Sequence, residues 1–153
     1  MNRTCIIVAD ARHARFFSVE PSDTPRHGMK LVEQLTLTNP DLFDLGPSAA
    51  GRPPTETRTH RQAGPGHRME FERAFGCEIA RHAAQLTGQW KEGTVILIAE
   101  LRMLGLCRAG LRDALNSVVQ LKEVAKNYAS LTASELRDRL DLTSIVSARP
   151  AGA

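Results

Sequence analysis

The chain has 153 residues, of which 42% are hydrophobic and 24% charged, with a formal net charge of +3 and a sequence pI near 9.0. These values are typical of one globular domain and exclude a collagen, a coiled coil or an intrinsically disordered chain. The mild excess of positive charge is compatible with nucleic acid binding but does not require it. No stretch approaches the roughly 20 apolar residues of a membrane span, so no membrane partner is expected.

The N-terminal residues and the cysteines indicate an ordinary cytoplasmic protein. The opening stretch, MNRTCIIVADARH, has an apolar run of only about five residues, which is shorter than that of a secretory signal. Cys5, Cys77 and Cys107 are odd in number and form no C-x-x-C pair, so they predict neither a zinc site nor a disulfide framework. Each is expected to be a small buried hydrophobe, and no cofactor is expected.

Three strands open the predicted fold. Residues 4–10 are apolar and β-branched, as in a buried strand. A second strand at 14–20 follows after a short connection, so the two are expected to be antiparallel neighbours. Turn residues fill 21–28. Residues 29–37 then alternate between apolar and polar side chains, which predicts a third strand and completes a meander.

The segment from 39 to 67 shows neither the period of a strand nor that of a helix. It is rich in proline and glycine, and its second half is basic. Structureless loops of more than about 15 residues are uncommon in compact domains and are usually functional or disordered. Several residues of this loop are expected to bind RNA or another anion, together with Arg68 just beyond it. Those in the loop are Arg58, His60, Arg61, Gly64, Gly66 and His67.

A long amphipathic helix is predicted at 69–88, because apolar side chains recur along one face. Glu70 and Glu72 are expected in its first turn, where the helix dipole favours negative charge. The N–H groups of Met69 and Glu70 are then placed to hold an anion. Gly76 in mid-helix costs about 1 kcal/mol relative to alanine, which predicts the close approach of another backbone.

The next elements alternate between strand and helix patterns. Residues 93–100 form a β-branched run, typical of a strand buried on both faces. Residues 101–118 have helical spacing interrupted by Gly105 and Gly110, which predicts a short helix, a bend and a second helix. Strand character returns at 118–124.

A final helix completes the predicted fold. Thr132 and Glu135 have the spacing of a capping box and predict a short helix through about Leu140. The order β-β-β-loop-α-β-α-β-α predicts one α/β domain with a mixed sheet of about five strands and helices on its faces. The domain is expected at 1–142, followed by a flexible tail at 143–153.

Polar residues follow two of the predicted strands. Asp10, Arg12 and His13 come directly after the first strand, and Glu100 ends the buried one. The carboxyl ends of strands are common site positions in α/β sheets. Asp10 is expected to cap the turn and to pair with Arg12 or Arg15. Two carboxylates without a third ligand do not predict a Mg²⁺ site, so no metal is expected.

Three arginines, Arg102, Arg108 and Arg112, fall on the glycine-containing helical segment. They form either a solvated face or a second basic surface that would extend the one around the loop.

Four blocks of the sequence resemble, in order, the bacterial host attachment protein family. They are IIVADARHARFF, FERAFGCEIARHAAQL, VILIAELRMLGLCRAGL and KEVAKNYASLTASELRDRL, and the match covers most of Thr4 to Leu140. That family is similar to the middle domain of eukaryotic and archaeal peptide-chain release factors. In those factors a loop carrying Gly-Gly-Gln precedes a long helix, enters the ribosomal peptidyl-transferase centre and assists hydrolysis of the peptidyl-tRNA ester.

The corresponding place here reads Gly64-Pro65-Gly66-His67, without the glutamine. The resemblance therefore implies a cytoplasmic, translation-factor-like domain that binds the ribosome or RNA through its basic loop, with little or no catalysis. Arginines can follow phosphates, and glycines permit close backbone approach.

Two alternatives remain open. One is an esterase-type hydrolase that acts on peptidyl-tRNA-like esters, with Gln62 or His67 orienting water. Their neighbour His60 does not give a zinc pattern with His67. The other alternative is a protein-interaction factor that is needed indirectly for attachment to host cells.

Overall fold

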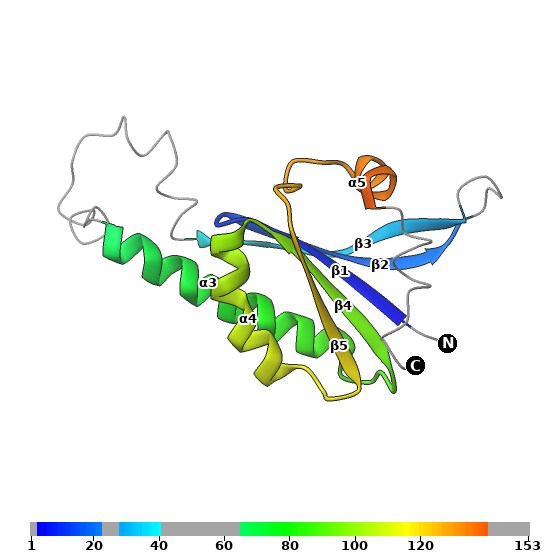
Figure 1. Cartoon of the computed structure of the whole chain (residues 1–153), viewed down its shortest axis with the longest axis horizontal. Helices are drawn as coiled ribbons and strands as arrows, with labels where there is room; N and C mark the ends of the chain where they lie inside the picture. The colour runs from blue at the N-terminus through cyan, green and yellow to red at the C-terminus, as the bar shows by residue number, and fades with distance from the viewer. Residues whose placement is uncertain (1–2, 23–27, 41–64, 141–153) are drawn as a thin grey trace.

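The structure is a computed structural model that describes residues 3–22, 28–40 and 65–140 (Figure 1). Its elements follow the predicted order, so the predicted α/β fold is confirmed. They are β1 (Arg3–Ala9), β2 (His13–Pro21), β3 (Met29–Thr38), α3 (Pro65–Thr87), β4 (Gly93–Ala99), α4 (Leu101–Ala114), β5 (Val119–Ala125) and α5 (Ala133–Leu140). Most of the predicted loop at 39–67, and the predicted tail at 143–153, lie outside the described residues.

The strands form one mixed sheet in the order β3-β2-β1-β4-β5. The first three strands pair antiparallel, as a meander, whereas β4 runs parallel to β1 and β5 parallel to β4. Because β1 and β4 are parallel neighbours, the residues after their carboxyl ends meet at the same edge of the sheet. This arrangement places Asp10 and Glu100 close together.

Both faces of the two central strands are buried, which explains their continuous apolar runs. Ile7 and Leu97 belong to the core cluster that α3 and α4 complete. Their sequence neighbours Ile6 and Ile96 point to the opposite face, where α5 supplies Leu136. Figure 1 shows α3 and α4 lying together and α5 apart from them.

Helices α3 and α4 pack closely because glycines lie at their contact. A Cβ on Gly76 would lie 3.0 Å from the carbonyl oxygen of Leu106 in α4. A Cβ on Gly110 would lie 3.2 Å from the Cβ of Ala80 in α3. The predicted close approach of a second backbone at Gly76 is therefore confirmed.

The predicted bend in the second helix is wrong, because α4 is continuous from Leu101 to Ala114. Each glycine costs about 1 kcal/mol in a helix interior. The helix nevertheless buries a full stripe of side chains against the core, and full burial of one large apolar side chain is worth about 1.5–3 kcal/mol. The buried residues are Met103, Leu104, Cys107 and Leu111.

Helix α3 begins at Pro65, four residues before the predicted start. Proline is favoured at the first helical position because its ring fixes φ and its missing N–H is not needed there. The expectation that Glu70 and Glu72 lie in the first turn is therefore wrong.

Within the described residues, no helix combines the length and the apolar character needed to cross a bilayer.

The capping box that begins α5 is confirmed. The N–H of Glu135 donates to Thr132 Oγ1 at 3.1 Å, and the N–H of Thr132 donates to Glu135 Oε1 at 2.9 Å. These hydrogen bonds satisfy two backbone donors at the helix start and lower the pKa of the Glu135 carboxyl.

The three cysteines are free but lie in different surroundings. Burial raises the pKa of the Cys5 thiol to about 12. Burial, with a smaller contribution from nearby Cys77, also raises the pKa of Cys107 to about 12. Both thiols are therefore protonated at neutral pH. Cys77 is exposed on α3, so its predicted burial is wrong.

Candidate functional site at the carboxyl ends of β1 and β4

Asp10 caps the turn between β1 and β2. Its Oδ1 accepts hydrogen bonds from the N–H groups of Arg12, at 2.8 Å, and of His13, at 2.7 Å. The ring of His13 lies 3.4 Å from the same oxygen. Asp10 thus contacts Arg12 through the backbone and not through the guanidinium that the sequence suggested. This carboxylate fixes the turn by an Asx-type arrangement.

Arg15, the other expected partner of Asp10, turns to a different part of the molecule. Its guanidinium donates to the carbonyl oxygen of Ala129 at 2.8 Å and lies 5.3 Å from the ring centroid of Phe17. It therefore ties the segment after β5 to the sheet and takes no part in the turn of Asp10.

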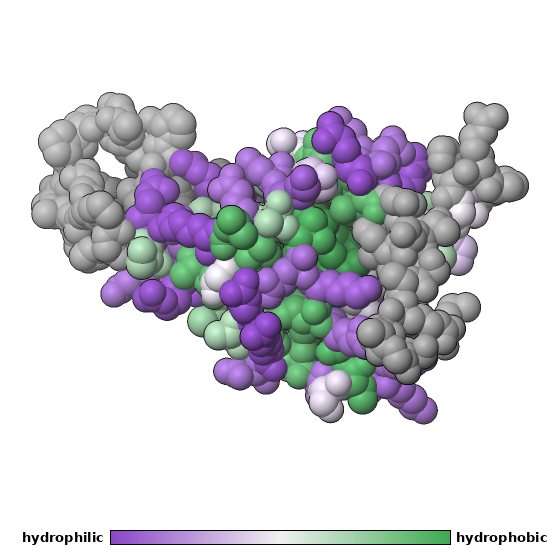
Figure 2. Space-filling view, in the orientation of Figure 1, coloured by the Kyte–Doolittle hydropathy of each residue, from purple (hydrophilic) through white to green (hydrophobic). Residues whose placement is uncertain are grey.

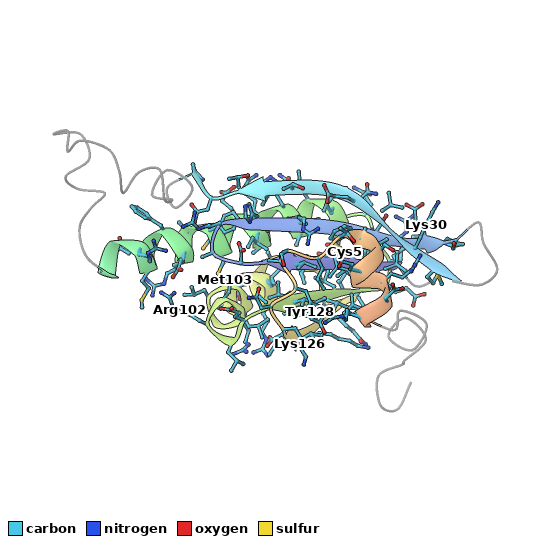
Figure 3. All side chains as sticks on the ribbon, turned by 90° about the horizontal axis from the view of Figure 1, so that it is seen from above. Cys5, Lys30, Arg102, Met103, Lys126 and Tyr128 are labelled. Atoms are coloured by element: carbon cyan, nitrogen blue, oxygen red, sulfur yellow. The ribbon has the colours of Figure 1, made fainter. Side chains whose placement is uncertain are left out.

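Glu72 of α3 is buried and forms an ion pair with Arg102 of α4. Arg102 Nη1 donates to Oε2 at 3.0 Å, and Nη2 contacts Oε1. Figure 3 labels Arg102 and Met103 at the start of α4. Only 4% of the Glu72 side chain is exposed, against 54% of that of Arg102. A buried carboxylate needs such a partner, so this pair fixes the two helices to one another.

The two strand-end carboxylates and Glu72 line one small cavity of about 50 Å³. Arg12 in the turn and His13 at the start of β2 lie outside it. The cavity is large enough to hold very few water molecules but too small to hold a substrate. Its lining residues are Asp10, Ala11, Glu72, Glu100, Arg102, Met103 and Leu106. Among residues 3–22, 28–40 and 65–140, no three His, Cys, Asp or Glu side chains are grouped so that they could hold a metal ion.

Asn39 joins this region to α3 and was not singled out from the sequence. Only 2% of the residue is exposed. Its Nδ2 donates to the carbonyl oxygens of Ala11, at 3.1 Å, and Phe71, at 3.2 Å. Its N–H donates to the carbonyl oxygen of Arg12 at 2.8 Å. The chain thus leaves β3 from a fixed point, and the Asn-Pro dipeptide at 39–40 was the available sequence signal for it.

Most of the predicted RNA-binding and catalytic residues fall outside the part of the chain that the structure describes. These are Arg58, His60, Arg61, Gln62 and Gly64. Gly66 and His67 belong to the first turn of α3, and Arg68 follows them.

The backbone donors at the start of α3 differ from those expected. The first N–H groups of a helix have no partner within it. Since the helix begins at Pro65, which has no N–H, these groups belong to Gly66 and His67. The N–H groups of Met69 and Glu70 lie further inside the helix, so they cannot hold an anion in the way the sequence suggested.

The surface after this first turn is polar. Figure 1 shows the first turns of α3 projecting beyond the strands, and Figure 2 shows hydrophilic side chains over this part of the molecule. Arg68, Glu70 and Arg73 are exposed. Arg102 neutralises Glu72. The exposed charges between residues 68 and 73 are therefore two arginines and one glutamate, a net positive charge.

The three arginines of α4 do not form a continuous basic surface. Arg102 pairs with Glu72, and Arg108 forms two hydrogen bonds with Glu123 of β5, at 2.7 and 2.8 Å. The hydrogen bond from Arg108 lowers the pKa of Glu123, and the same bond raises the pKa of Arg108. Two of the three charges are thus neutralised within the fold.

A family model described as "Protein required for attachment to host cells" matches residues 5–140. The chain belongs to this family. The match begins within β1 and ends with α5, so it includes Asn39, the whole of α3 and the strand-end cluster, which consists of Asp10, Arg12, His13 and Glu100. It confirms the host attachment resemblance.

The remaining comparisons add little about this host attachment family protein. No curated protein matches it. One solved structure that matches is the crystal structure of the type II variant of the Aquifex aeolicus Ppx/GppA phosphatase. The identity is 10%, the match covers 80% of this chain and 36% of that chain, and the TM-score is 0.33. Such a likeness carries no functional argument, and the comparisons do not support the release-factor resemblance.

Proposed function

We propose that this host attachment family protein is a cytoplasmic, translation-factor-like domain that binds RNA on the ribosome through the basic segment from Arg58 to Arg68. The observation that supports the proposal is the position of α3. Its first turns project beyond the sheet (Figure 1), and the basic segment immediately precedes them in the sequence. The sequence therefore places positive charge at an outlying end of the molecule.

The charges of this end suit a phosphate backbone. Phosphate contacts supply affinity without reading the base sequence. The segment supplies Arg58 and Arg61, and Arg68 and Arg73 are exposed on the helix that follows. Glu72 does not repel phosphate strongly from this surface, since it is buried against Arg102.

The start of α3 is also well anchored, which favours a binding role. Asn39 donates to the carbonyl oxygen of Phe71, and Glu72 joins α3 to α4. A binding segment attached to rigid elements loses less entropy when it meets its partner. These contacts lie within the first two turns after Arg68.

Charge reversal of two arginines tests the proposal. We expect Arg58→Glu with Arg61→Glu to abolish co-sedimentation with ribosomes at low salt, because two phosphate contacts become repulsions. The matched control is Arg81→Glu with Arg112→Glu, which changes the net charge equally at exposed positions elsewhere. Equal co-sedimentation of the wild type and the Arg58/Arg61 variant would contradict the proposal.

The description of the family concerns attachment to host cells, and we propose that this chain contributes to attachment indirectly, through its intracellular RNA partner. Ester hydrolysis by Gln62 or His67 is not proposed, since no observation on the described residues favours it.

A further inference from the structure

A groove lies at the other end of α3, around the indole of Trp90. It consists of two adjoining hollows. One has a volume of about 380 Å³ and is lined by Arg3, Thr4, Cys5, Phe17, Ser18, Val19, Glu20, Gln34, Leu86 and Trp90. The other is lined by Arg3, Gln89, Trp90, Lys91 and Glu92. Because both include Arg3 and Trp90, we treat them as one feature, the Trp90 groove.

The Trp90 groove lies at the opposite end of α3 from Arg68. Helix α3 has 23 residues, so its two ends lie about 33 Å apart at 1.5 Å per residue. Leu86 and Trp90 mark its carboxyl-terminal end, where β2 and β3 extend beyond the helical layer. Phe16 is buried beneath the helices, whereas Ser18, two residues further along β2 on the same face, is half-buried. The hollow exists because β2 and β3 extend beyond the end of α3, the helix that covers this face.

The β2 end of the Trp90 groove offers hydrogen-bond acceptors. Gln34 Nε2 donates to Ser18 Oγ at 3.0 Å, and that hydroxyl donates to Glu20 Oε2 at 2.9 Å. The second carboxylate oxygen of Glu20 makes no hydrogen bond to the residues that the structure describes. It can therefore accept one from an N–H group of a ligand.

The opposite end of the groove is cationic. Arg3 and Lys91 are exposed there, and within the described part of the chain neither forms an ion pair. Glu92 also lines this end, so two cations face one carboxylate. A guanidinium beside an ammonium is suited to a phosphate group.

Trp90 lines both hollows, and its ring is held firmly. Its ring packs against Gly93, where even a Cβ would overlap it. The indole is therefore a fixed aromatic wall of both hollows. Bases of every kind stack on such side chains, because each has a flat aromatic face.

We propose that the Trp90 groove binds a nucleoside monophosphate whose base carries an exocyclic amino group. The base stacks on Trp90, its amino group donates to Glu20, and its phosphate meets Arg3 and Lys91. A volume of 380 Å³ lies within the range of about 300–1,000 Å³ that small-ligand pockets occupy. Adenine, guanine and cytosine project the amino group from the ring, whereas uracil offers only its ring N3–H, so the groove discriminates against uridine monophosphate.

The experiment uses Trp90 as its own probe, because it is the only tryptophan of the chain. The full-length protein is titrated with each of the four nucleoside monophosphates and with inorganic phosphate, by tryptophan fluorescence and by calorimetry. We expect saturable quenching by the adenine, guanine and cytosine nucleotides and about tenfold weaker binding of uridine monophosphate, the factor that a contact of about 1.4 kcal/mol supplies. A short oligonucleotide bound more tightly than the free nucleotide identifies the source as the end of an RNA strand.

Two variants locate the site. Arg3→Gln weakens binding of all four nucleotides about tenfold, and Glu20→Gln removes the discrimination against uridine monophosphate. Arg112→Gln, an exposed arginine outside the groove, leaves binding unchanged. The proposal is overturned by the absence of saturable binding, by equal binding of inorganic phosphate, or by binding that neither groove variant alters.

The inference does not depend on the proposed ribosome contact. Arg58→Glu with Arg61→Glu leaves nucleotide binding at its wild-type value, so the two proposals fail separately.

Discussion

At the scale of single residues, the charged side chains of this protein act mostly through specific partners within the fold. Glu72 is predicted to lie in the first turn of its helix, where the dipole favours negative charge. It is instead buried against Arg102, which is 30 residues away in the sequence. Asp10 caps its turn as predicted, through two backbone hydrogen bonds, but the predicted pairing with a guanidinium is wrong. Sequence spacing cannot show the partner of Glu72, because the packing of α3 on α4 brings Glu72 and Arg102 together.

The pair of Arg108 and Glu123 gives a prediction about pH at this scale. The hydrogen bond from Arg108 lowers the pKa of Glu123 in the folded state. A carboxyl with a lowered folded pKa contributes stability that is fully present above its unfolded pKa of about 4.3 and that is lost as the pH falls through the folded pKa. We expect Arg108→Gln to reduce the urea midpoint at neutral pH and to have a smaller effect as the pH falls below about 4.

The measurement is a series of urea denaturation curves between neutral and acid pH. Glu123→Gln serves as the matched variant, since it removes the titrating group and should show the same loss at neutral pH. A difference between wild type and Arg108→Gln that stays constant through the acid range would contradict the assignment.

At the scale of elements, local patterns predicted the strands and the last helix, whereas contacts between elements decided the rest. The β-branched runs and the capping box of Thr132 and Glu135 are local patterns, so a few neighbouring residues are enough to predict the strand or the helix start. The bend predicted in α4 is absent, because burial of one face holds the helix straight through Gly105 and Gly110. The predicted start of α3 is wrong because Pro65 continues the proline- and glycine-rich composition of the irregular segment before it.

The glycines of the two packed helices give a prediction at this scale. Alanine is better than glycine in a helix by about 1 kcal/mol. A Cβ on Gly105 would meet no neighbouring element within 4 Å, so we expect Gly105→Ala to stabilise the protein by about 0.5–1 kcal/mol. Gly76→Ala would place a Cβ 3.0 Å from the carbonyl oxygen of Leu106, so the helices must separate and the protein loses stability.

Both variants can be compared by urea denaturation, with the free energy of unfolding as the measured quantity. Each introduces the same methyl group into a helix, and only the surroundings differ. Stabilisation of equal size at both positions would show that α3 and α4 do not approach each other at Gly76.

At the scale of the whole molecule, α3 separates two surfaces that differ in chemistry. Its amino-terminal end continues from the basic segment, and its carboxyl-terminal end borders the Trp90 groove. The strand-end cluster lies near the first of these ends, where Asn39 and Glu72 hold the helix to the domain. The sequence indicated the basic segment through its charge. It did not indicate the groove, which combines residues of β1, β2, β3 and α3 with the turn after α3.

Salt dependence distinguishes the two surfaces. Each phosphate contact of a single strand contributes roughly −0.7 to the slope of log K against log salt concentration, so an RNA segment that makes four such contacts has a slope of roughly −2.8. We expect Arg58→Gln with Arg61→Gln to reduce the magnitude of that slope by about 1.4, because two contacts are lost. A mononucleotide in the Trp90 groove carries a single phosphate, so its binding should vary little with salt and should not respond to these substitutions. Filter binding of RNA and calorimetry of the nucleotide, over the same range of salt, measure the two slopes. An RNA slope that the double variant leaves unchanged would place the phosphate contacts elsewhere on the molecule.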